Sequence, residues 1–226
     1  MATVLLIRHG RTPANVQGVL AGWSPGVPLD EVGRHQAQEL SERLAGVRLN
    51  AIVTSPLERA RETAEALLRG QGSRSAIHVD DRMGECQYGA WTGKSLKDLA
   101  KDPLWKVVQS HASAVSFPEG ETMLGMHARA VEAVRDWNAR LGDKAVCAVV
   151  SHGDVIKAVV ADALGMHLDD FQRIVIDPCS VSVVRYTTVR PFVLRVNDTG
   201  GDLSFLARKR ARRSSDAAVG GGSGES

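Results

Sequence analysis

The chain has 226 residues and a formal net charge of +2, with 43% hydrophobic and 24% charged side chains. This is an ordinary globular balance, and the length fits one generous α/β domain or two small ones. Such a chain can fold without disulfides or a structural metal. The three cysteines (Cys86, Cys147 and Cys179) are far apart and odd in number, which excludes a disulfide framework and a zinc-finger spacing.

The segments that would direct a chain out of the cytoplasm are not evident. Met1–Val4 has no charged start and no long apolar stretch follows it, so we expect no signal peptide. No apolar run approaches the roughly 20 residues that a bilayer crossing needs. Widely spaced cysteines also favour a reducing compartment. We therefore expect a cytoplasmic protein with no membrane partner.

The basic residues are concentrated near the end of the chain. Five of the 28 lysines and arginines lie in Arg208–Arg213, so the preceding part is close to neutral. A nucleic-acid-binding domain normally has a basic face, so we expect no nucleic-acid partner. Residues 208–226, basic and then rich in Gly and Ser, cannot bury enough apolar surface to become ordered. The chain is thus divided into a domain over 1–207 and a disordered tail over 208–226.

The first half of the chain alternates between strand and helix patterns. The apolar run Thr3–Ile7 predicts a buried strand, and a loop rich in Gly and Pro follows to Pro28. Asp30 is expected to cap a helix. Ala51–Thr54 predicts a second strand. Ser55 is then expected to cap another helix, with proline at its first position.

The second half continues the alternation after a less regular segment. Residues 80–118 are expected to be irregular, apart from a short helix around Ser95–Lys101. The remaining predicted elements are a strand at Ile77–Val79, a long helix over Met126–Leu141, a strand at Ala145–Val150, a helix over Asp154–Leu164 and late strands at Val181–Tyr186 and Phe192–Val196. The whole pattern predicts a three-layer α/β/α sandwich with a mostly parallel central sheet.

Two predicted strands end in the same way. Leu5–Ile7 is followed by Arg8, His9 and a glycine, and the strand at Ala145–Val150 is followed by Ser151, His152 and a glycine. In open α/β sheets, ligands bind outside the carboxyl ends of the strands. Both histidines are therefore expected at that edge.

Arg59 is the third candidate. It lies in the first turn of the helix predicted after Ser55, where the positive end of the helix dipole disfavours a cation. The same end attracts phosphate. Arg8 and Arg59 together are suited to bind a phosphate through planar, charge-assisted hydrogen bonds. Singly, each of these features is more often structural, and their joint occurrence is what favours a site.

Five ordered segments resemble one known family. They are Leu6–Thr12 with Asn15, Ser55–Ala64, Glu85 with Gly89, Trp91 and Gly93, Phe117–Thr122, and Val150–Gly153. Together they resemble the signature of the histidine phosphatase superfamily, also called the phosphoglycerate mutase-like family. The resemblance extends from the first strand to about Tyr186.

The resemblance implies a role for each candidate. It implies that His9 becomes phosphorylated, that Glu85 is the proton donor, and that the phosphate is bound by Arg8, Arg59 and His152, with Asn15 and Tyr88 as further substrate-binding candidates. Phosphoryl transfer depends mainly on positioning and charge stabilisation. We expect a neutral His9 with one ring nitrogen held by a hydrogen bond, a His152 that is protonated in the transition state, and a Glu85 with a raised pKa.

No cofactor is expected. His9, Glu85 and His152 are residue types that also bind metals, but the neighbouring arginines would repel a cation, so we expect no metal.

The same superfamily contains phosphatases and cofactor-dependent mutases. The mutases resemble this chain around Glu85 but have Arg and His where Cys86 and Gln87 stand. Fewer cations favour release of a phosphorylated intermediate, so we expect a phosphomonoesterase acting on a small phosphorylated metabolite. The alternatives are a phosphoglycerate mutase-type isomerase and, from another class, a catalytically silent interaction module.

Two further expectations concern the surroundings of the site. Tyr88, Trp91, Trp105 and Phe117 are either an apolar lid over the leaving group or ordinary core. Members of this family often form dimers, so a homodimer through a strand edge or an apolar helix face is an additional expectation.

Overall fold

The computed structural model describes residues 2–71 and 75–200 of the chain. Six strands form one sheet in the order β3-β2-β4-β1-β5-β6. The first four in this order are parallel, and β5 and β6 are antiparallel to their neighbours. The strands are β1 (Thr3–Arg8), β2 (Ala51–Thr54), β3 (Ile77–Val79), β4 (Val146–Ser151), β5 (Val181–Arg185) and β6 (Phe192–Asp198). The predicted mostly parallel sheet is confirmed.

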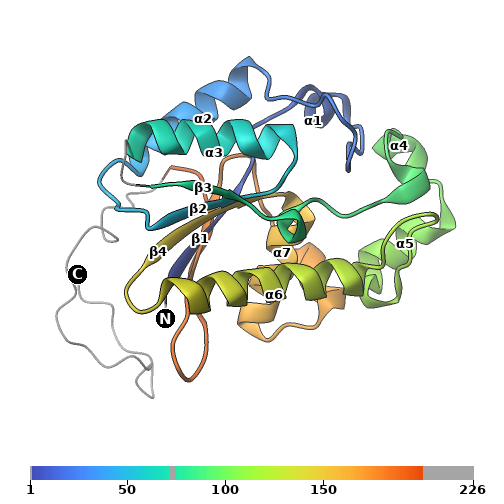
Figure 1. The fold of residues 1–226 in the computed structure, drawn as a ribbon. Helices are drawn as coiled ribbons and strands as arrows, with labels where there is room; N and C mark the ends of the chain where they lie inside the picture. Colours follow the sequence, from blue (N-terminus) through green and yellow to red (C-terminus); the bar gives the residue numbers. More distant parts are fainter. Residues whose placement is uncertain (1, 72–74, 201–226) are drawn as a thin grey trace.

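Helices cover both faces of this sheet (Figure 1). One face carries α2 and α3 and the other carries α6 and α7, while α1, α4 and α5 gather toward one end of the molecule. The helices are α1 (Pro13–Gln17), α2 (Glu31–Arg43), α3 (Glu58–Gln71), α4 (Leu96–Leu99), α5 (Pro103–Ser110), α6 (Met123–Leu141) and α7 (Gly153–Leu164). The three-layer α/β/α prediction is therefore correct.

The central strands supply both halves of the core. In β1, Leu5 and Ile7 pack with the α2 and α3 side, whereas Val4 and Leu6 pack with the α6 and α7 side. Successive side chains of a strand point to opposite faces, so a strand covered by helices on both sides must be apolar throughout. This double burial fixes the depth and register of β1, and therefore the position of the residues that follow it.

The helix after β2 begins later than the sequence predicts. α3 starts at Glu58, so Ser55 is not its N-cap. The Ser55 hydroxyl instead accepts a hydrogen bond from the Leu57 N–H (3.2 Å) and bonds to the His152 ring (2.7 Å). The hydroxyl thus links the backbone just before α3 to His152, the residue that follows β4.

Two helices lie in segments that were expected to be irregular. α1 begins after Thr12, whose side chain caps it, with Pro13 at the first position. α5 begins after Asp102 in the same way, with Pro103 next. A capping side chain followed by proline therefore starts a helix at both of these places, but does not do so at Ser55.

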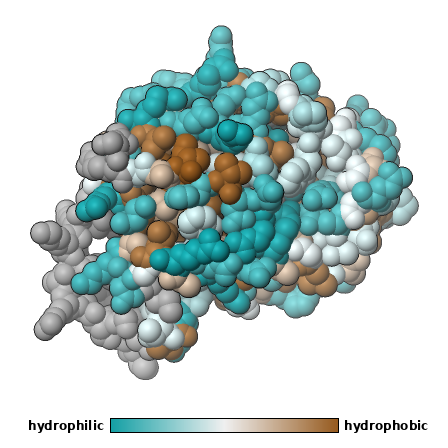
Figure 2. All heavy atoms as spheres, viewed as in Figure 1, coloured by the Kyte–Doolittle hydropathy of each residue, from teal (hydrophilic) through white to brown (hydrophobic). Residues whose placement is uncertain are grey.

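The outer surface on the side of α3 and α6 is mostly hydrophilic, with apolar atoms gathered where the sheet edge is exposed (Figure 2). β3 forms that edge, and Val79 in it is 50% exposed. A homodimer through this edge stays a prediction. No helix in the described ranges combines the length and hydropathy needed to cross a membrane. The predicted tail over 208–226 lies outside the described residues.

Gly33 provides a test of how α2 supports the loop after β1. A Cβ at Gly33 would lie 2.0 Å from the Arg11 carbonyl oxygen, so the backbone would have to move. We predict that Gly33→Ala lowers the free energy of unfolding by about 1–3 kcal/mol in urea denaturation. Gly46→Ala is the matched control, because nothing lies within 4 Å of its Cβ position. Equal stability losses in the two variants would contradict this packing.

Candidate active site

The two histidines lie side by side at the carboxyl end of the sheet. β1 and β4 pair in parallel with Arg8 opposite Ser151, so each histidine follows its strand by one residue at the same edge. The centroids of the His9 and His152 rings are 5.1 Å apart. Both side chains are buried, with exposed fractions of 3% and 0%. The convergence predicted from the two strand ends is confirmed.

The His9 ring is held as a neutral imidazole. Its Nδ1 lies 2.7 Å from the Gly10 carbonyl oxygen. Because a carbonyl oxygen only accepts, Nδ1 carries the proton and Nε2 carries the lone pair. Burial lowers the pKa of His9 well below its usual value, and the guanidinium groups of Arg59 and Arg8 lower it further. This is the state that a nucleophilic histidine requires.

Arg59 contacts the nitrogen that would attack. It is the second residue of α3 and is 3% exposed, which confirms its predicted place in the first turn. Its Nε donates to His9 Nε2 (3.2 Å), and its Nη2 donates to the Gly22 carbonyl (2.8 Å). The Trp23 indole, next in the chain, donates to the Glu85 carbonyl. Arg59 is therefore held between the His9 ring and the Gly22 carbonyl, and its binding of phosphate stays a prediction.

Arg8 supplies a second guanidinium group. Its Nη1 donates to the Ile176 carbonyl (2.6 Å), whereas its buried Nε has no hydrogen-bond partner within the described residues. A Cβ at Gly153 would lie 3.7 Å from the Arg8 guanidinium carbon, so Arg8 covers the start of α7. A helix N-terminus and two guanidinium groups together favour an anion at this place.

His152 is buried beside Arg59 and bonds to Ser55. Burial, followed by the charge of Arg59, holds the pKa of His152 well below its usual value in the ligand-free protein, and protonation of His152 in the transition state stays a prediction. Its Nε2 lies 2.7 Å from the Ser55 hydroxyl, and its buried Nδ1 has no partner in the part of the chain that the structure describes. If the hydroxyl donates to Nε2, Nδ1 carries a proton that can be donated to a phosphate oxygen.

Glu85 is suited to hold a proton near neutral pH. Burial raises its pKa to about 7, the Asp154 carboxylate contributes to the rise, and Arg59 and Arg8 oppose it. The Oε1 atom accepts a hydrogen bond from the Cys86 N–H (2.9 Å). The raised pKa expected for a proton donor is therefore present, and its largest cause is desolvation.

Asn15 and Tyr88 are held by local contacts. The Asn15 Oδ1 accepts from the N–H (3.0 Å) and the hydroxyl (2.9 Å) of Thr12, at the start of α1. The buried Tyr88 donates its hydroxyl to Asp154 Oδ2 (2.8 Å), and its ring packs edge-on against Phe117. These contacts explain both residues structurally, and substrate binding by either of them stays a prediction.

The aromatic residues of the middle segment belong to the core. Trp91 and Phe117 are each 3% exposed and lie in the hydrophobic cluster that packs under α6. Trp105 stacks on Trp91 and is partly buried against the same cluster. Of the two expectations, ordinary core describes these side chains and an apolar lid does not.

Sequence reasoning missed three contributors to the site. Gly22 acts through a backbone carbonyl, for which a sequence has no signal. Ser55 was read as a helix cap. Asp154 had a usable signal, because it is two residues beyond His152 and so falls in the first turn of the helix at the sheet edge.

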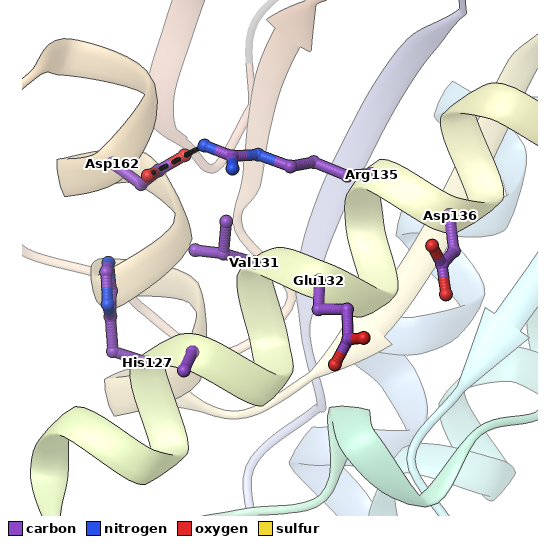
Figure 3. A pocket seen from close by; sticks show the side chains of 7 residues that line it. His127, Val131, Glu132, Arg135, Asp136 and Asp162 are labelled. Carbon is purple, nitrogen blue, oxygen red and sulfur yellow. Dashed lines mark hydrogen bonds and ion pairs between the residues drawn. The ribbon is translucent and has the colours of Figure 1, made fainter.

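A separate open groove lies between α6 and α7 (Figure 3). His127 and Val131 line it, and the exposed Arg135 pairs across it with Asp162 (3.0 Å). None of the candidate site residues lines this groove. Among the described residues, no group of three or more His, Cys, Asp or Glu side chains is placed to hold a metal ion.

Comparison with known proteins agrees with the geometry. Residues 4–199 match the family model of the histidine phosphatase superfamily (branch 1). The chain is 30% identical to a probable phosphoglycerate mutase GpmB of Proteus mirabilis over 210 residues, which covers 91% of this chain and 95% of the relative.

Two solved structures show the same fold. Bacillus stearothermophilus YhfR is 31% identical, with a TM-score of 0.81 over 88% of this chain and 98% of that one. A putative alpha-ribazole-5'-P phosphatase from Escherichia coli is 25% identical, with a TM-score of 0.77 over 88% and 97% of the two chains. The family match, the shared fold and the convergent histidines and arginines lead to one conclusion: the chain belongs to the histidine phosphatase superfamily.

Proposed function

We propose that this chain is a phosphomonoesterase that hydrolyses a small phosphorylated metabolite through a phosphohistidine at His9. The observation that carries the proposal is the convergence of three side chains at one sheet edge: the Nδ1 of His9 is held by the Gly10 carbonyl, the His152 ring lies 5.1 Å from the His9 ring, and the Arg59 Nε contacts His9 Nε2. The pKa of Glu85, raised to about 7, supports its role as the proton donor. The guanidinium groups of Arg8 and Arg59 supply the charge that a phosphoryl group needs.

The reaction divides into two balanced steps. In the first, the His9 Nε2 lone pair attacks phosphorus, the ester P–O bond breaks, and Glu85 gives its proton to the leaving oxygen. In the second, the Glu85 carboxylate takes a proton from water, the water oxygen attacks phosphorus, and the P–N bond electrons return to Nε2. Arg8, Arg59 and the His152 N–H stabilise the equatorial oxygens in both steps.

The charge around Glu85 supports hydrolysis over phosphate retention. The side chain of Cys86 is buried, and the N–H of Gln87 donates to Glu121 (2.8 Å). Another cation, Arg129, is already engaged by Glu121 (2.6 Å) and by the carbonyls of Gly84 (2.8 Å) and Glu85 (2.9 Å). A second phosphate, which a mutase must hold, would thus find few available cations here.

The names of similar proteins point in both directions. The GpmB relative is called a probable phosphoglycerate mutase, and the Escherichia coli structure is called a putative phosphatase. The alternative proposal is therefore a phosphoglycerate mutase-type isomerase, and a catalytically silent interaction module is the contrasting class. The three experiments below separate these functions.

Transfer of phosphate to His9 is the first test. We predict that brief turnover of phosphorus-labelled p-nitrophenyl phosphate, stopped in alkaline denaturant, leaves acid-labile label on the peptide that contains His9. His9→Ala should abolish both the label and phosphate release. His35→Ala is the control, because this exposed histidine on α2 pairs with Glu39 and is not one of the candidate site residues. An active, labelled His9→Ala variant would refute the proposal.

The pH dependence tests the role of Glu85. Only its protonated form can act as the acid, so kcat/KM for an alkyl phosphate should fall as the pH rises through about 7. Glu85→Gln should lower kcat/KM by about 10²–10⁴-fold and remove this decline. Glu39→Gln, an exposed carboxylate on α2, should leave the profile unchanged. A decline that persists in Glu85→Gln would assign the titration to another group.

The third test distinguishes hydrolase from mutase. We predict that 3-phosphoglycerate, with and without 2,3-bisphosphoglycerate, gives no primer-stimulated isomerisation, because the site has too few available cations for a bisphosphate. Phosphorus NMR resolves the isomers and inorganic phosphate in one experiment. Rapid isomerisation that depends on the primer would favour the mutase instead.

A further inference from the structure

Glu85 lies in a segment, residues 84–88, that forms neither helix nor strand. Its neighbours Gly84 and Cys86 are buried. Buried backbone carbonyls outside a helix or sheet need hydrogen-bond donors from side chains or water. The position of the Glu85 carboxyl group therefore depends on the side chains that hold this backbone.

One guanidinium group holds three carbonyls at and before Glu85. Arg129 lies on α6, and its side chain is 19% exposed. Its Nη1 donates to the carbonyls of Arg82 (2.6 Å) and Gly84 (2.8 Å), and its Nη2 donates to the carbonyl of Glu85 (2.9 Å). A guanidinium group is planar and rigid, so it fixes these three oxygens relative to α6, which an ammonium group on a flexible stem cannot do.

Glu121 extends this hold to the other side of Glu85. Its Oε1 accepts from Arg129 Nη2 (2.6 Å) and from the Gln87 N–H (2.8 Å), and its Oε2 accepts from Arg129 Nε (3.0 Å). The Glu121 N–H donates in turn to the Gln87 carbonyl (2.9 Å). Each of the five N–H donors of Arg129 therefore has an acceptor, and the backbone is held on both sides of Glu85.

Two further contacts tie the same stretch of backbone to the site. The Ser151 hydroxyl donates to the Met83 carbonyl (2.7 Å), and the Trp23 indole donates to the Glu85 carbonyl. Ser151 is the last residue of β4 and directly precedes His152. Because these contacts do not involve Arg129, we expect that the loss of Arg129 shifts Glu85 without releasing the whole segment.

We propose that Arg129, paired with Glu121, is a positioning residue that sets the place of the Glu85 carboxyl group relative to His9. This inference deepens the proposed function and rests on it, because it concerns Glu85 as the proton donor. All the N–H groups of Arg129 already have acceptors in the protein. Arg129 therefore acts through the backbone of Glu85 rather than by binding the phosphate.

The test compares kcat/KM for two substrates in Arg129→Lys. Lysine keeps the positive charge, but its single nitrogen cannot reach the three carbonyls and Glu121 together. For an alkyl phosphate, whose leaving oxygen needs a proton, kcat/KM should fall by about 10–10²-fold, because a small displacement of a reacting group costs that much. For p-nitrophenyl phosphate, whose leaving group needs little protonation, it should fall by no more than about threefold.

Arg135→Lys is the matched control. Arg135 lies on the same helix, is exposed, and pairs with Asp162 (3.0 Å) across the groove of Figure 3. Its kcat/KM should match that of the unmodified protein with both substrates. Inhibition by inorganic phosphate should be unchanged in both variants, because neither alters a candidate phosphate-binding residue. A general structural defect in Arg129→Lys would instead lower kcat/KM for the two substrates by the same factor.

A double-mutant cycle separates action through Glu85 from an independent effect. In Glu85→Gln the general acid is absent, so its position no longer matters. Adding Arg129→Lys to Glu85→Gln should therefore lower kcat/KM for the alkyl phosphate by no more than about twofold. If the two losses multiply instead, Arg129 does not act through Glu85 and the inference is wrong.

The outcomes distinguish this inference from the proposed function. Equal losses for both substrates, or an Arg129→Lys protein that behaves as Arg135→Lys does, overturn the inference and leave the phosphohistidine mechanism standing. If Arg129→Lys does not fold, Glu121→Gln decides, because its amide has one acceptor where the carboxylate offers Arg129 two. The same substrate-dependent loss is expected there, and its absence overturns the inference. If Glu85→Gln retains full activity toward the alkyl phosphate, it is the proposed function that has failed.

Discussion

The parallel register of β1 and β4 is the constraint on which the site depends. It places Arg8 opposite Ser151, so that His9 and His152 leave the sheet together with their rings 5.1 Å apart. A slip of one residue would point alternate side chains to the wrong face and separate the rings. Alternate side chains of β1 pack into the two halves of the core. A slip would place different side chains in each half and disrupt the packing there.

The pKa shifts at this edge of the sheet arise largely from burial. Desolvation is the first cause of the lowered pKa values of His9 and His152 and of the raised pKa of Glu85. The guanidinium groups then act in the same sense on the histidines and in the opposite sense on Glu85. The result is an unprotonated imidazole nitrogen and a carboxyl with a pKa of about 7, a combination that suits the proposed transfer of a phosphoryl group to nitrogen and of a proton to the departing oxygen.

The sequence predicted the elements that have a strong apolar pattern. It missed features that depend on capping side chains or on contacts between residues distant in sequence. β1, β2 and β4, with the histidines after β1 and β4 and Arg59 at the start of α3, could be placed because strand ends share one edge. The capping patterns at Thr12 and Asp102 were overlooked, and the one at Ser55 was misjudged because its hydroxyl bonds to a histidine distant in sequence. Long-range partners of this kind, like the Gly22 carbonyl, are visible only in three dimensions.

The central claim is that His9 Nε2 attacks a phosphoryl group held by Arg8 and Arg59. A crystal structure of the protein with vanadate, which mimics the trigonal bipyramidal transition state, tests it most directly. We predict vanadium bonded to His9 Nε2, equatorial oxygens bound by the two guanidinium groups, and Glu85 beside the opposite apical oxygen. Vanadate bound with another residue at the apical position, or bound away from His9, would contradict it.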